Sequence, residues 1–488
     1  MNELRRHPVA PQKLYIDGAW EEGSGEAQDV LSPIDGSTLT TIICASATDV
    51  DRAVAAARRA FDDGRWSRTA PAHRKKVLNK LANLIEANAL ELAVLGVRDN
   101  GTEIGMALKA EPGSAAGTFR YYAEALDKVY GEIAPTPGNV LGLVHKEPVG
   151  VVGAIVPWNF PLMIGAWKLA PALAAGNSVV LKPAETASLS LLKLAELAAE
   201  AGLPDGVLNV VTGKGSVTGE ALAMSMDVDV LVFTGSGGVG RRLLEYSARS
   251  NLKRCYLELG GKSPNVVFAD APDLEQAAKI SAAGIFRNAG QVCVAGSRLL
   301  VEASVHDEFV EALSRHAAAM KVGDPLDLTT NIGAVNNIPQ LEGNLGFVSR
   351  AVEDGATLAL GGSRILEETG GYYMEPTVLT GVQPQHHVAQ NEVFGPVLAV
   401  TPFTSDAEAV QIANSTKFGL AAGVWTSNLS RAHHMVRDIQ AGVVHVNTYG
   451  GPDGTVPLGG VKQSGNGHDK SMHAFDKYFD LKTAWMQL

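Results

Sequence analysis

The sequence predicts an α/β protein with a doubly wound parallel sheet and a second α/β unit after it. From residue 149 onward, short and continuously apolar segments alternate with helical patterns, which is typical of buried parallel strands joined by helices. The alternation starts again after Gly261, which indicates a second sheet. The length of 488 residues is enough for about three domains.

The composition excludes several classes of protein. The chain is 46% hydrophobic, carries a net charge of −11 and has no basic run, so nucleic acid is not an expected partner. Its three cysteines, Cys44, Cys255 and Cys293, lie far apart, which favours a reducing compartment over a disulfide framework or a cysteine zinc site. The start lacks an apolar signal region, and the longest apolar run, 149–158, is too short to span a bilayer. We expect a soluble, cytoplasmic protein without a membrane partner.

The part before residue 149 mixes short strands and helices. Apolar residues recur at helical spacing in three segments, and the stretch after them is broken by Pro and Gly, so a ribbon that projects from the body is expected there. The predicted elements are strands at 13–20 and 39–46, helices at 49–63, 72–98 and 115–129, and the ribbon at 132–147.

Five apolar strands with intervening helices predict the first sheet. Such sheets bind ligands at the carboxyl ends of their strands. The strands are expected at 149–156, 177–182, 208–212, 228–234 and 254–261, with helices at 188–201 and 241–250.

The second unit repeats this pattern, and the tail 474–488 alternates as an exposed strand does. A chain end so rich in apolar groups favours pairing with a neighbouring subunit. The expected strands are 265–269, 298–303, 376–382, 395–403 and 423–427, and the expected helices are 273–289, 304–320, 406–415 and 430–440.

The candidate nucleophile lies in the segment 286–298, FRNAGQVCVAGSR, between a helix and a strand. Cys293 stands between two valines in a turn flanked by glycines. A lone cysteine in apolar company is more often a small core residue, and only partners elsewhere in the chain reverse that reading. A free thiol has a pKa of about 8.5, so it needs a base or a favourable field to react near neutral pH.

A glycine-rich loop, Gly235 to Gly240, satisfies GxGxxG after a strand and before a helix, which is the context of a dinucleotide fingerprint. A glycine-rich connector is the alternative. A helix beginning after Gly240 would offer free N–H groups to a phosphate. Lys182 and Glu185 follow another parallel strand. The Glu185 carboxylate is better placed than that of Glu258 to accept both ribose hydroxyls. The alternative is that Lys182 and Glu185 lie in a solvated turn.

Two further residues give Cys293 possible partners. Glu258 ends an apolar strand beside two glycines, where a carboxylate is paired, exposed at the rim or kept for chemistry. Asn159 follows another strand, and its amide either caps a turn or donates to an oxyanion. A thiol, an amide, a carboxylate and a dinucleotide fold together suit the removal of hydride from an aldehyde. The two His pairs, 386–387 and 433–434, lack ligand spacing, so no metal site is expected.

At this point the chain resembles the NAD(P)-dependent aldehyde dehydrogenase superfamily. The matching segments follow the family order and cover nearly the whole chain. They are PWNFP (157–161), KPAE (182–185), FTGS (233–236), LELGGKSP (257–264), GQVCVAGSR (290–298), EVFGPV (392–397) and GGVKQSGNG (459–467).

The resemblance implies a role for each candidate. Cys293 would be the nucleophile, Glu258 the base for the deacylating water, and the Asn159 side chain with the Cys293 N–H the oxyanion hole. NAD would be the cofactor, with NADP as a possible second, held by Val156, Trp158, Lys182, Glu185, Gly235, Ser236, Val239, Leu259, Glu392 and Phe394. The aldehyde tunnel would be lined by Phe160, Met163, Ile164, Trp167, Val292, Val294, Tyr449 and Leu458, with Glu111 and Asp453 as nearby acids.

The resemblance also implies the domain organisation. It assigns 1–129 and 148–260 to a Rossmann-like NAD-binding domain and 261–460 to a catalytic domain. The ribbon 130–147 and the tail 461–488 would serve a homodimer or homotetramer.

One departure affects a proton relay. Many relatives have Arg-Glu where this chain has His468 and Asp469. The family's acid is thought to pair with a lysine, here Lys168, and Asp469 is one methylene shorter. Because His468 stands in place of that arginine, Asp480 in the tail would also lack the arginine as an ion-pair partner.

The substrate stays open at this stage. Segments 123–137, 141–162 and 462–478 look like the bacterial γ-glutamyl-γ-aminobutyraldehyde and related aminoaldehyde dehydrogenases. An apolar tunnel suits medium-chain aliphatic or aromatic aldehydes equally well. A cysteine hydrolase and a non-catalytic binding protein are the alternatives from other classes; the first is weakened because no histidine shares a motif with Cys293.

Overall fold

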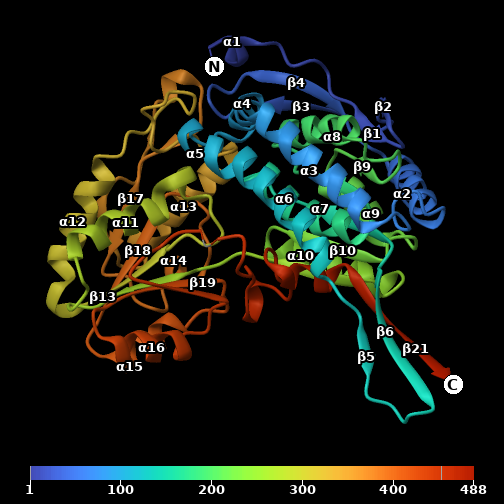
Figure 1. The fold of residues 1–488 in the computed structure, drawn as a ribbon. Coiled ribbons are helices and arrows are strands. Elements are labelled where there is room, and N and C mark those ends of the chain that lie inside the picture. Colours follow the sequence, from blue (N-terminus) through green and yellow to red (C-terminus); the bar gives the residue numbers. More distant parts are fainter. Residues whose placement is uncertain (1, 452) are drawn as a thin grey trace.

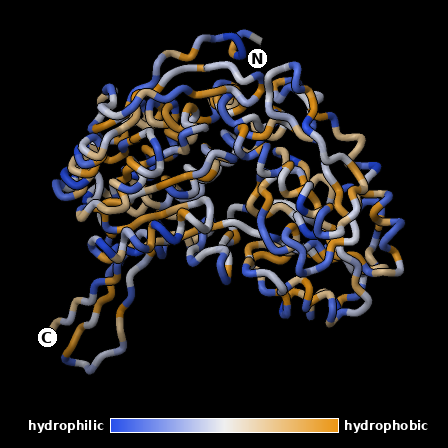
Figure 2. The backbone as a smooth tube through the Cα atoms, turned by 180° about the vertical axis from the view of Figure 1, so that it is seen from behind, coloured by the Kyte–Doolittle hydropathy of each residue, from blue (hydrophilic) through white to orange (hydrophobic). Residues whose placement is uncertain are grey.

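The computed structural model describes residues 2–451 and 453–488, which form two α/β units and a projecting ribbon (Figure 1). In Figure 2, seen from behind, hydrophobic segments run through the interior of both units. No helix in the described part of the chain has the length and apolar character needed to cross a membrane.

The first sheet has the strand order β11-β10-β7-β8-β9-β1-β2, and the five predicted strands in it are parallel. The earliest of the five, β7, lies in the middle, so the chain winds outward in both directions and the strand order reverses between β7 and β10. The bounds are β7 Val151–Ile155, β8 Ser178–Lys182, β9 Leu208–Val210, β10 Val230–Thr234 and β11 Arg254–Glu258, with the antiparallel β1 Leu14–Ile16 and β2 Ala19–Glu21 at one edge.

Helices cover both faces of this sheet because its strands are apolar on both sides. On β7, Val151 and Ile155 pack with the cluster that contains α2, whereas Val152 and Ala154 pack with the cluster that contains α7 and α8. The helices are α2 Ala47–Asp62, α3 Pro71–Ala87, α4 Ala89–Asn100, α5 Ile104–Leu108, α6 Ser114–Ala125, α7 Pro161–Ala175, α8 Leu189–Ala201, α9 Glu220–Met224 and α10 Gly237–Arg249.

The second sheet has the order β14-β17-β18-β13-β12-β19-β20 and is parallel except for the edge strand β14. Its strands are β12 Pro264–Val267, β13 Arg298–Glu302, β14 Thr357–Leu360, β17 Thr377–Thr380, β18 Val397–Phe403, β19 Ala421–Trp425 and β20 Val443–Val446. Its helices are α11 Leu274–Phe286, α12 His306–Ala318, α13 Ile338–Glu353, α14 His387–Gln390, α15 Asp406–Ala413 and α16 Leu429–Asp438. The predicted α/β fold class is therefore confirmed.

The ribbon is a three-stranded antiparallel sheet that leaves the body (Figure 1). It consists of β5 Glu132–Ala134, β6 Val140–Pro148 and β21 Phe479–Gln487, and β6 and β21 pair along their whole length. The predicted ribbon and terminal strand are confirmed. The preceding segment behaves differently, because Asn466 hydrogen-bonds to the backbone of Cys255 and Leu257 in β11. Residues 461–478 thus pack against the body.

Two of the expected helices had wrong bounds, and several helices, among them α7 and α13, were not predicted. The single helix expected at 72–98 is two helices separated at Asn88, whose backbone leaves helical geometry. The helix α13 was missed, since its glycines weaken the helical signal, and it forms because Leu341, Val348 and Ala351 are buried. The helix expected to begin after Gly240 begins at Gly237, because Ser236 caps it by accepting a hydrogen bond from the N–H of Val239.

Several short strands were also missed. They are β3 Ala27–Leu31, which pairs with β4 Thr38–Ile43, the pair β15 Arg364–Ile365 and β16 Tyr373–Met374, and the edge strands β14 and β20. A helix of one and a half turns, α1 Asn2–Arg6, precedes them all.

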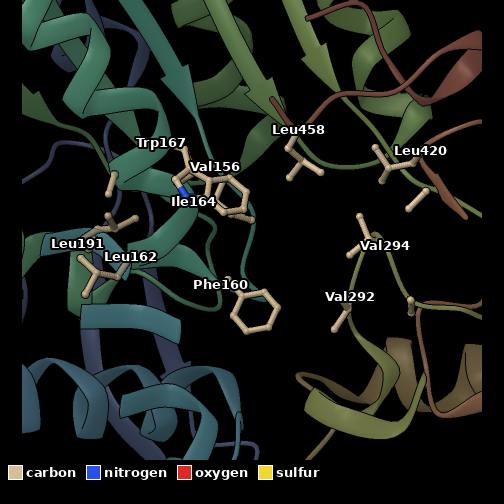
Figure 3. Close-up of a cluster of buried hydrophobic side chains, with 14 of the residues drawn as sticks. Val156, Phe160, Leu162, Ile164, Trp167, Leu191, Val292, Val294, Leu420 and Leu458 are labelled. Atoms are coloured by element: carbon tan, nitrogen blue, oxygen red, sulfur yellow. The ribbon is translucent and has the colours of Figure 1, made fainter. Parts of the chain in front are cut away.

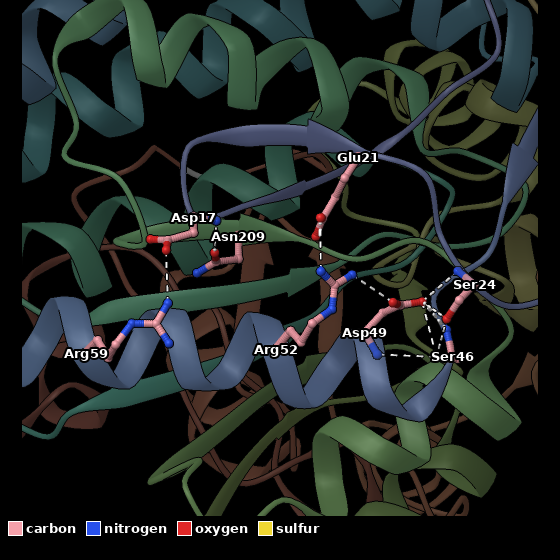
Figure 4. Close-up of polar contacts among 8 residues, drawn as sticks. All are labelled: Asp17, Glu21, Ser24, Ser46, Asp49, Arg52, Arg59 and Asn209. Atoms are coloured by element: carbon pink, nitrogen blue, oxygen red, sulfur yellow. Dashed lines mark hydrogen bonds and ion pairs between the residues drawn. The ribbon is translucent and has the colours of Figure 1, made fainter.

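A polar network fastens α2 to the N-terminal strands (Figure 4). The carboxylate of Asp49 accepts hydrogen bonds from the N–H groups of Ser24 (2.8 Å) and Ser46 (2.9 Å) and from Arg52 (2.9 Å). Arg52 also donates to Glu21 at 3.0 Å. Burial opposes ionisation of Asp49, but these donors outweigh it and hold its pKa well below the usual range. Helix α2 is thereby locked against the edge of the first sheet.

Candidate active site

The loop between α11 and β13 carries Cys293 in a constrained conformation. Asn288, Ala289 and Gly290 all have positive φ angles, of 49°, 51° and 72°. Buried hydrogen bonds impose this shape: Thr102 donates to the Asn288 amide oxygen at 2.7 Å, and the Asn288 N–H donates to Glu103 at 3.1 Å. Such strain persists only where the surroundings enforce it. The loop therefore presents the thiol at a fixed place.

Cys293 opens into a cavity of about 400 Å³ between the two units. The first unit contributes residues that follow the carboxyl ends of β7, β10 and β11, on either side of the point where the strand order reverses. The lining includes Trp158, Asn159, Ile164, Gly235, Ser236, Leu259, Gly260, Phe347, Glu392 and Phe394. The thiol, the glycine loop and the predicted carboxamide donor thus share one cavity.

The electrostatic environment disfavours the thiolate. Burial, together with the carboxylates of Glu392 and Glu258, raises the pKa of Cys293 to about 12. Burial likewise raises the pKa of Glu392 to about 7 and holds that of Glu258 well above its usual range. The sulfur must therefore lose its proton to a nearby acceptor as it reacts.

The Asn159 side chain lies against the Cys293 loop and is buried. Its Nδ2 donates to the carbonyl oxygen of Gln291 at 2.9 Å, and its backbone carbonyl accepts from Asn288 at 3.2 Å. A primary amide has two N–H hydrogens. One is used to fix the side chain, and the other is available to an oxygen in the cavity that the residue lines.

Glu258, at the end of β11, is buried, and in the described part of the chain its Oε1 has no hydrogen-bond partner. A buried, unpaired carboxylate is costly unless it takes up a proton or serves chemistry. Burial first, and the negative charge of Asp469 second, raise its pKa.

Lys168 is the one charged residue in α7, which is otherwise apolar and, except for Met163, buried. Its Nζ donates to Asp469 Oδ2 at 2.5 Å, so the shorter acid does reach the lysine. Lys477, which sequence reasoning missed, donates to the other oxygen, Oδ1, at 2.6 Å. Burial opposes ionisation of Asp469, but the two ammonium groups hold its pKa below the usual range. The apolar neighbours Ala474, Phe475 and Tyr478 were the signal that could have identified Lys477.

The cofactor side of the site lies at the ends of β8 and β10. Lys182 is buried, and its Nζ lies 3.7 Å from the carboxylate of the half-buried Glu185. A side chain on Gly240 would come within 2.9 Å of Leu259, so this glycine lets α10 pack closely on the strand that leads to the site. The N–H groups at the start of α10 and the Glu185 carboxylate fit a pyrophosphate and a ribose, respectively. The residues present therefore fit a dinucleotide.

Glu392 and Phe394 approach from the second unit. The Glu392 carboxylate accepts from the Gly261 N–H at 3.0 Å, and a Cβ on Gly260 would overlap it. Phe394, with φ of 57°, meets Trp158 edge to face at a centroid distance of 5.3 Å. Val156 is buried at the end of β7, whereas the side chain of Val239 is exposed on α10.

The predicted tunnel residues come from both units. Figure 3 shows Phe160, Ile164 and Trp167 on one side and Val292, Val294 and Leu458 on the other. Met163, the remaining α7 residue of the set, is half-buried at the same helical end.

Two residues near the tunnel do not lie as a lining would. The Tyr449 hydroxyl donates to the carbonyl oxygen of Val294 at 2.8 Å, and its ring packs where Gly284, Gly296 and Gly423 lack side chains, so it supports the Cys293 loop from behind. Glu111 is buried and accepts from the Met163 N–H at 2.7 Å; burial raises its pKa to about 8. It therefore holds the start of α7, whereas Asp453 is exposed at a second cavity.

Asp480 in the tail, which was expected to lack an arginine partner, has one from another part of the chain. Asp480 pairs with Arg254 at 2.7 Å, and so β21 remains fastened to β11 by a charge pair.

Comparison with known proteins shows which family this chain matches. The model of the aldehyde dehydrogenase family matches residues 20–484. The chain is 49% identical over 477 residues to the NADP/NAD-dependent aldehyde dehydrogenase PuuC of Escherichia coli, covering 98% of this chain and 96% of that protein.

Solved structures agree over the whole chain. An indole-3-acetaldehyde dehydrogenase variant of P. syringae, in complex with NAD+ and IAA, has a TM-score of 0.98 at 50% identity, covering 100% of this chain and 98% of that one. A γ-glutamyl-γ-aminobutyraldehyde dehydrogenase of Burkholderia cenocepacia has a TM-score of 0.96 at 49% identity, covering 98% and 97%.

Proposed function

We propose site roles and a substrate class from one premise: the chain belongs to the aldehyde dehydrogenase family and is an NAD(P)-dependent aldehyde dehydrogenase. The observation that carries the proposal is the shared cavity, where Cys293 from the second unit faces the strand ends of the first. The test is to mix the protein with NAD and an aldehyde and to follow NADH. A carboxylate product with one NADH per aldehyde supports the proposal; an ester-cleavage rate that is indifferent to NAD, with no NADH formed, would favour a cysteine hydrolase.

Cys293 forms the first covalent bond. Its sulfur adds to the aldehyde carbon, the carbonyl π electrons move to oxygen, and the thiol proton passes to Glu258. Asn159 Nδ2 and the Cys293 N–H donate to the oxygen, where negative charge develops. NAD, held by the residues at the ends of β8 and β10, would accept the hydride that the tetrahedral carbon loses. The oxyanion then re-forms the C=O bond, which leaves a thioester.

Glu258 and the lysine–aspartate group complete the turnover. Glu258 first releases the thiol proton toward the Lys168–Asp469 pair. It then takes a proton from water as the water oxygen attacks the thioester carbon, and the sulfur leaves as thiolate and recovers that proton from Glu258. Lys168, paired with Asp469, lies close enough to Glu258 for its charge to lower the Glu258 pKa. This pair offers the proton a path away from the cavity.

Lys477, the second lysine that pairs with Asp469, is proposed to tune the pKa of Glu258. Lys477 adds a buried positive charge that lowers the Glu258 pKa. Lys477→Met is therefore expected to raise that pKa and to move the acidic limb of the pH profile of kcat to higher pH, because a carboxylate that loses a nearby positive charge holds its proton more tightly. The measurement is kcat from pH 5.5 to 9.5. Lys477→Arg should restore the profile, the exposed Lys76→Met is the matched control, and an unshifted limb in Lys477→Met would contradict the role.

Glu185 is proposed to favour NAD over NADP by repelling a 2′-phosphate. Replacing it with Gln is expected to raise the kcat/KM ratio of NADP to NAD by about tenfold, which corresponds to the loss of about 1.4 kcal/mol of repulsion. The two efficiencies are compared by NAD(P)H formation, with the exposed Glu200→Gln as control. A ratio that stays constant would leave the preference to other residues.

The proposed natural substrate is an aminoaldehyde or a γ-glutamylated aminoaldehyde, supported by the 49% identity to the γ-glutamyl-γ-aminobutyraldehyde dehydrogenase. An aromatic aldehyde is the second candidate, because the tunnel side chains in Figure 3 are apolar and the indole-3-acetaldehyde dehydrogenase is 50% identical. A screen of aliphatic, aromatic and amino-aldehydes decides between them.

The domain assignment, oligomer and location are further parts of the proposal. The two sheets support an NAD-binding domain at 1–129 and 148–260 and a catalytic domain at 261–460, and 130–147 with 461–488 would serve assembly.

On the ribbon, Ile133, Leu481 and Trp485 are 77%, 69% and 65% exposed, which favours a homodimer or homotetramer. Light scattering of the wild type and Trp485→Glu checks this. Free Cys44, Cys255 and Cys293 suit the cytoplasm.

A further inference from the structure

A second cavity, of about 290 Å³, is lined by the next turn of α7. Ile164 lines the cavity that holds Cys293, and Trp167, one helical turn later on α7, lines this second one. We name it the tail cavity; its lining includes Ser114, Thr118, Tyr121, Trp167, Asp453 and Lys470. An aldehyde with its carbonyl at Cys293 would extend its far end toward this cavity.

The tail cavity carries two opposite charges. The carboxylate of Asp453 is exposed, and the Lys470 ammonium lies 4.9 Å from the ring centroid of Trp167. Hydroxyl groups of Ser114, Thr118 and Tyr121 add polar surface around the pair. Apolar aldehydes need none of these groups.

The two charged residues are held together by their backbones. The Ser471 N–H donates to the Gly454 carbonyl at 2.8 Å, and Leu458 and Asp469 exchange backbone hydrogen bonds of 2.8 and 2.7 Å. The loop with Asp453 is thus tied to the segment with Lys470. Lys470 and Ser471 have φ angles of 64° and 50°, an uncommon conformation that the Tyr122 hydroxyl helps to hold by donating to the Ser471 carbonyl at 2.9 Å. The lysine is therefore placed at an energetic cost.

We propose that the tail cavity binds an α-amino-acid tail of the aldehyde substrate, with Asp453 accepting from its ammonium and Lys470 donating to its carboxylate. The inference rests on the proposed function and narrows its substrate class. A γ-glutamylated aminoaldehyde carries both charges at its far end. A free aminoaldehyde carries a cation alone, which Lys470 disfavours, and an aromatic aldehyde uses neither charge.

The test compares three aldehydes with known tails by their kcat/KM values. They are γ-glutamyl-γ-aminobutyraldehyde, its N-glutaryl analogue, which lacks the ammonium, and hexanal as the reference for each enzyme. For the wild type, the γ-glutamyl aldehyde is expected to exceed the N-glutaryl analogue by about tenfold, the effect of one charged hydrogen bond.

Two variants then assign each charge. Asp453→Asn is expected to reduce the γ-glutamyl to hexanal ratio about tenfold and to leave the N-glutaryl to hexanal ratio unchanged. Lys470→Gln is expected to reduce both ratios about tenfold. The exposed Asp476→Asn is the matched control, with both ratios as in the wild type.

The failures are distinguishable. A wild type that oxidises hexanal but does not discriminate between the two tails overturns the tail site and leaves the dehydrogenase intact. Variants that lower kcat/KM equally for all three aldehydes also overturn the tail site, because the effect is then on the chemistry that all three aldehydes share. A wild type that oxidises none of the three contradicts the proposed function itself.

Discussion

Cys293→Ala is expected to abolish aldehyde-dependent NADH formation, with a loss of kcat of about 10⁴-fold or more, because no other group supplies the sulfur that makes the carbonyl carbon tetrahedral. The alanine fits the half-buried position without strain, so NAD binding, measured by calorimetry, should be retained. The readout is NADH formation with hexanal and with γ-glutamyl-γ-aminobutyraldehyde.

The chain offers its own matched controls for this variant. Cys44 and Cys255 are the other two free cysteines; both are buried and lie outside the catalytic cavity. Cys44→Ala and Cys255→Ala should retain turnover. Full turnover in Cys293→Ala would contradict the nucleophile assignment.

Glu258→Gln is expected to separate acylation from deacylation. The amide cannot accept a proton from water, so steady-state turnover should fall by about 10²- to 10⁴-fold. A rapid burst of about one NADH per active site is expected to remain at high pH, where hydroxide takes the thiol proton that residue 258 no longer accepts. Stopped-flow absorbance at pH 9 measures the burst and the slow phase together.

The pH dependence gives this variant a second readout. Burial raises the Glu258 pKa above its usual range, and the deprotonated form is the base. Wild-type kcat should therefore increase as the pH rises through that raised pKa, and the increase should vanish in Glu258→Gln. The exposed Glu245→Gln should keep the wild-type profile. An unchanged steady-state rate in Glu258→Gln would show that another group activates the water.

Local sequence signals predicted much of the architecture. The five strands of the first sheet were found because parallel strands covered on both faces are continuously apolar, as in 228–234. The ribbon was found because Pro and Gly end the helical pattern before it. The helix α13 escaped because tertiary burial outweighs the weak propensity of its glycine-containing sequence.

The candidate site was predicted residue by residue but not as a geometry. Cys293, Asn159 and Glu392 stand in recognisable motifs, and the structure brings them around one cavity. Tyr449 and Glu111 were expected near the substrate, yet their hydrogen bonds support the Cys293 loop and α7. A side chain's direction depends on neighbours that are distant in sequence, and no local pattern records it.

The sequence by itself determined the order of strands and helices, the positions of the reactive groups and the family. These follow from periodicity and from motifs that lie within a few residues of one another. The tertiary structure decided which charges meet: Asp469 lies between Lys168 and Lys477, and Asp453 and Lys470 line the same cavity. Lys168 and Asp469 are 301 residues apart in the chain, and folding alone brings them within hydrogen-bond distance in a place from which water is excluded.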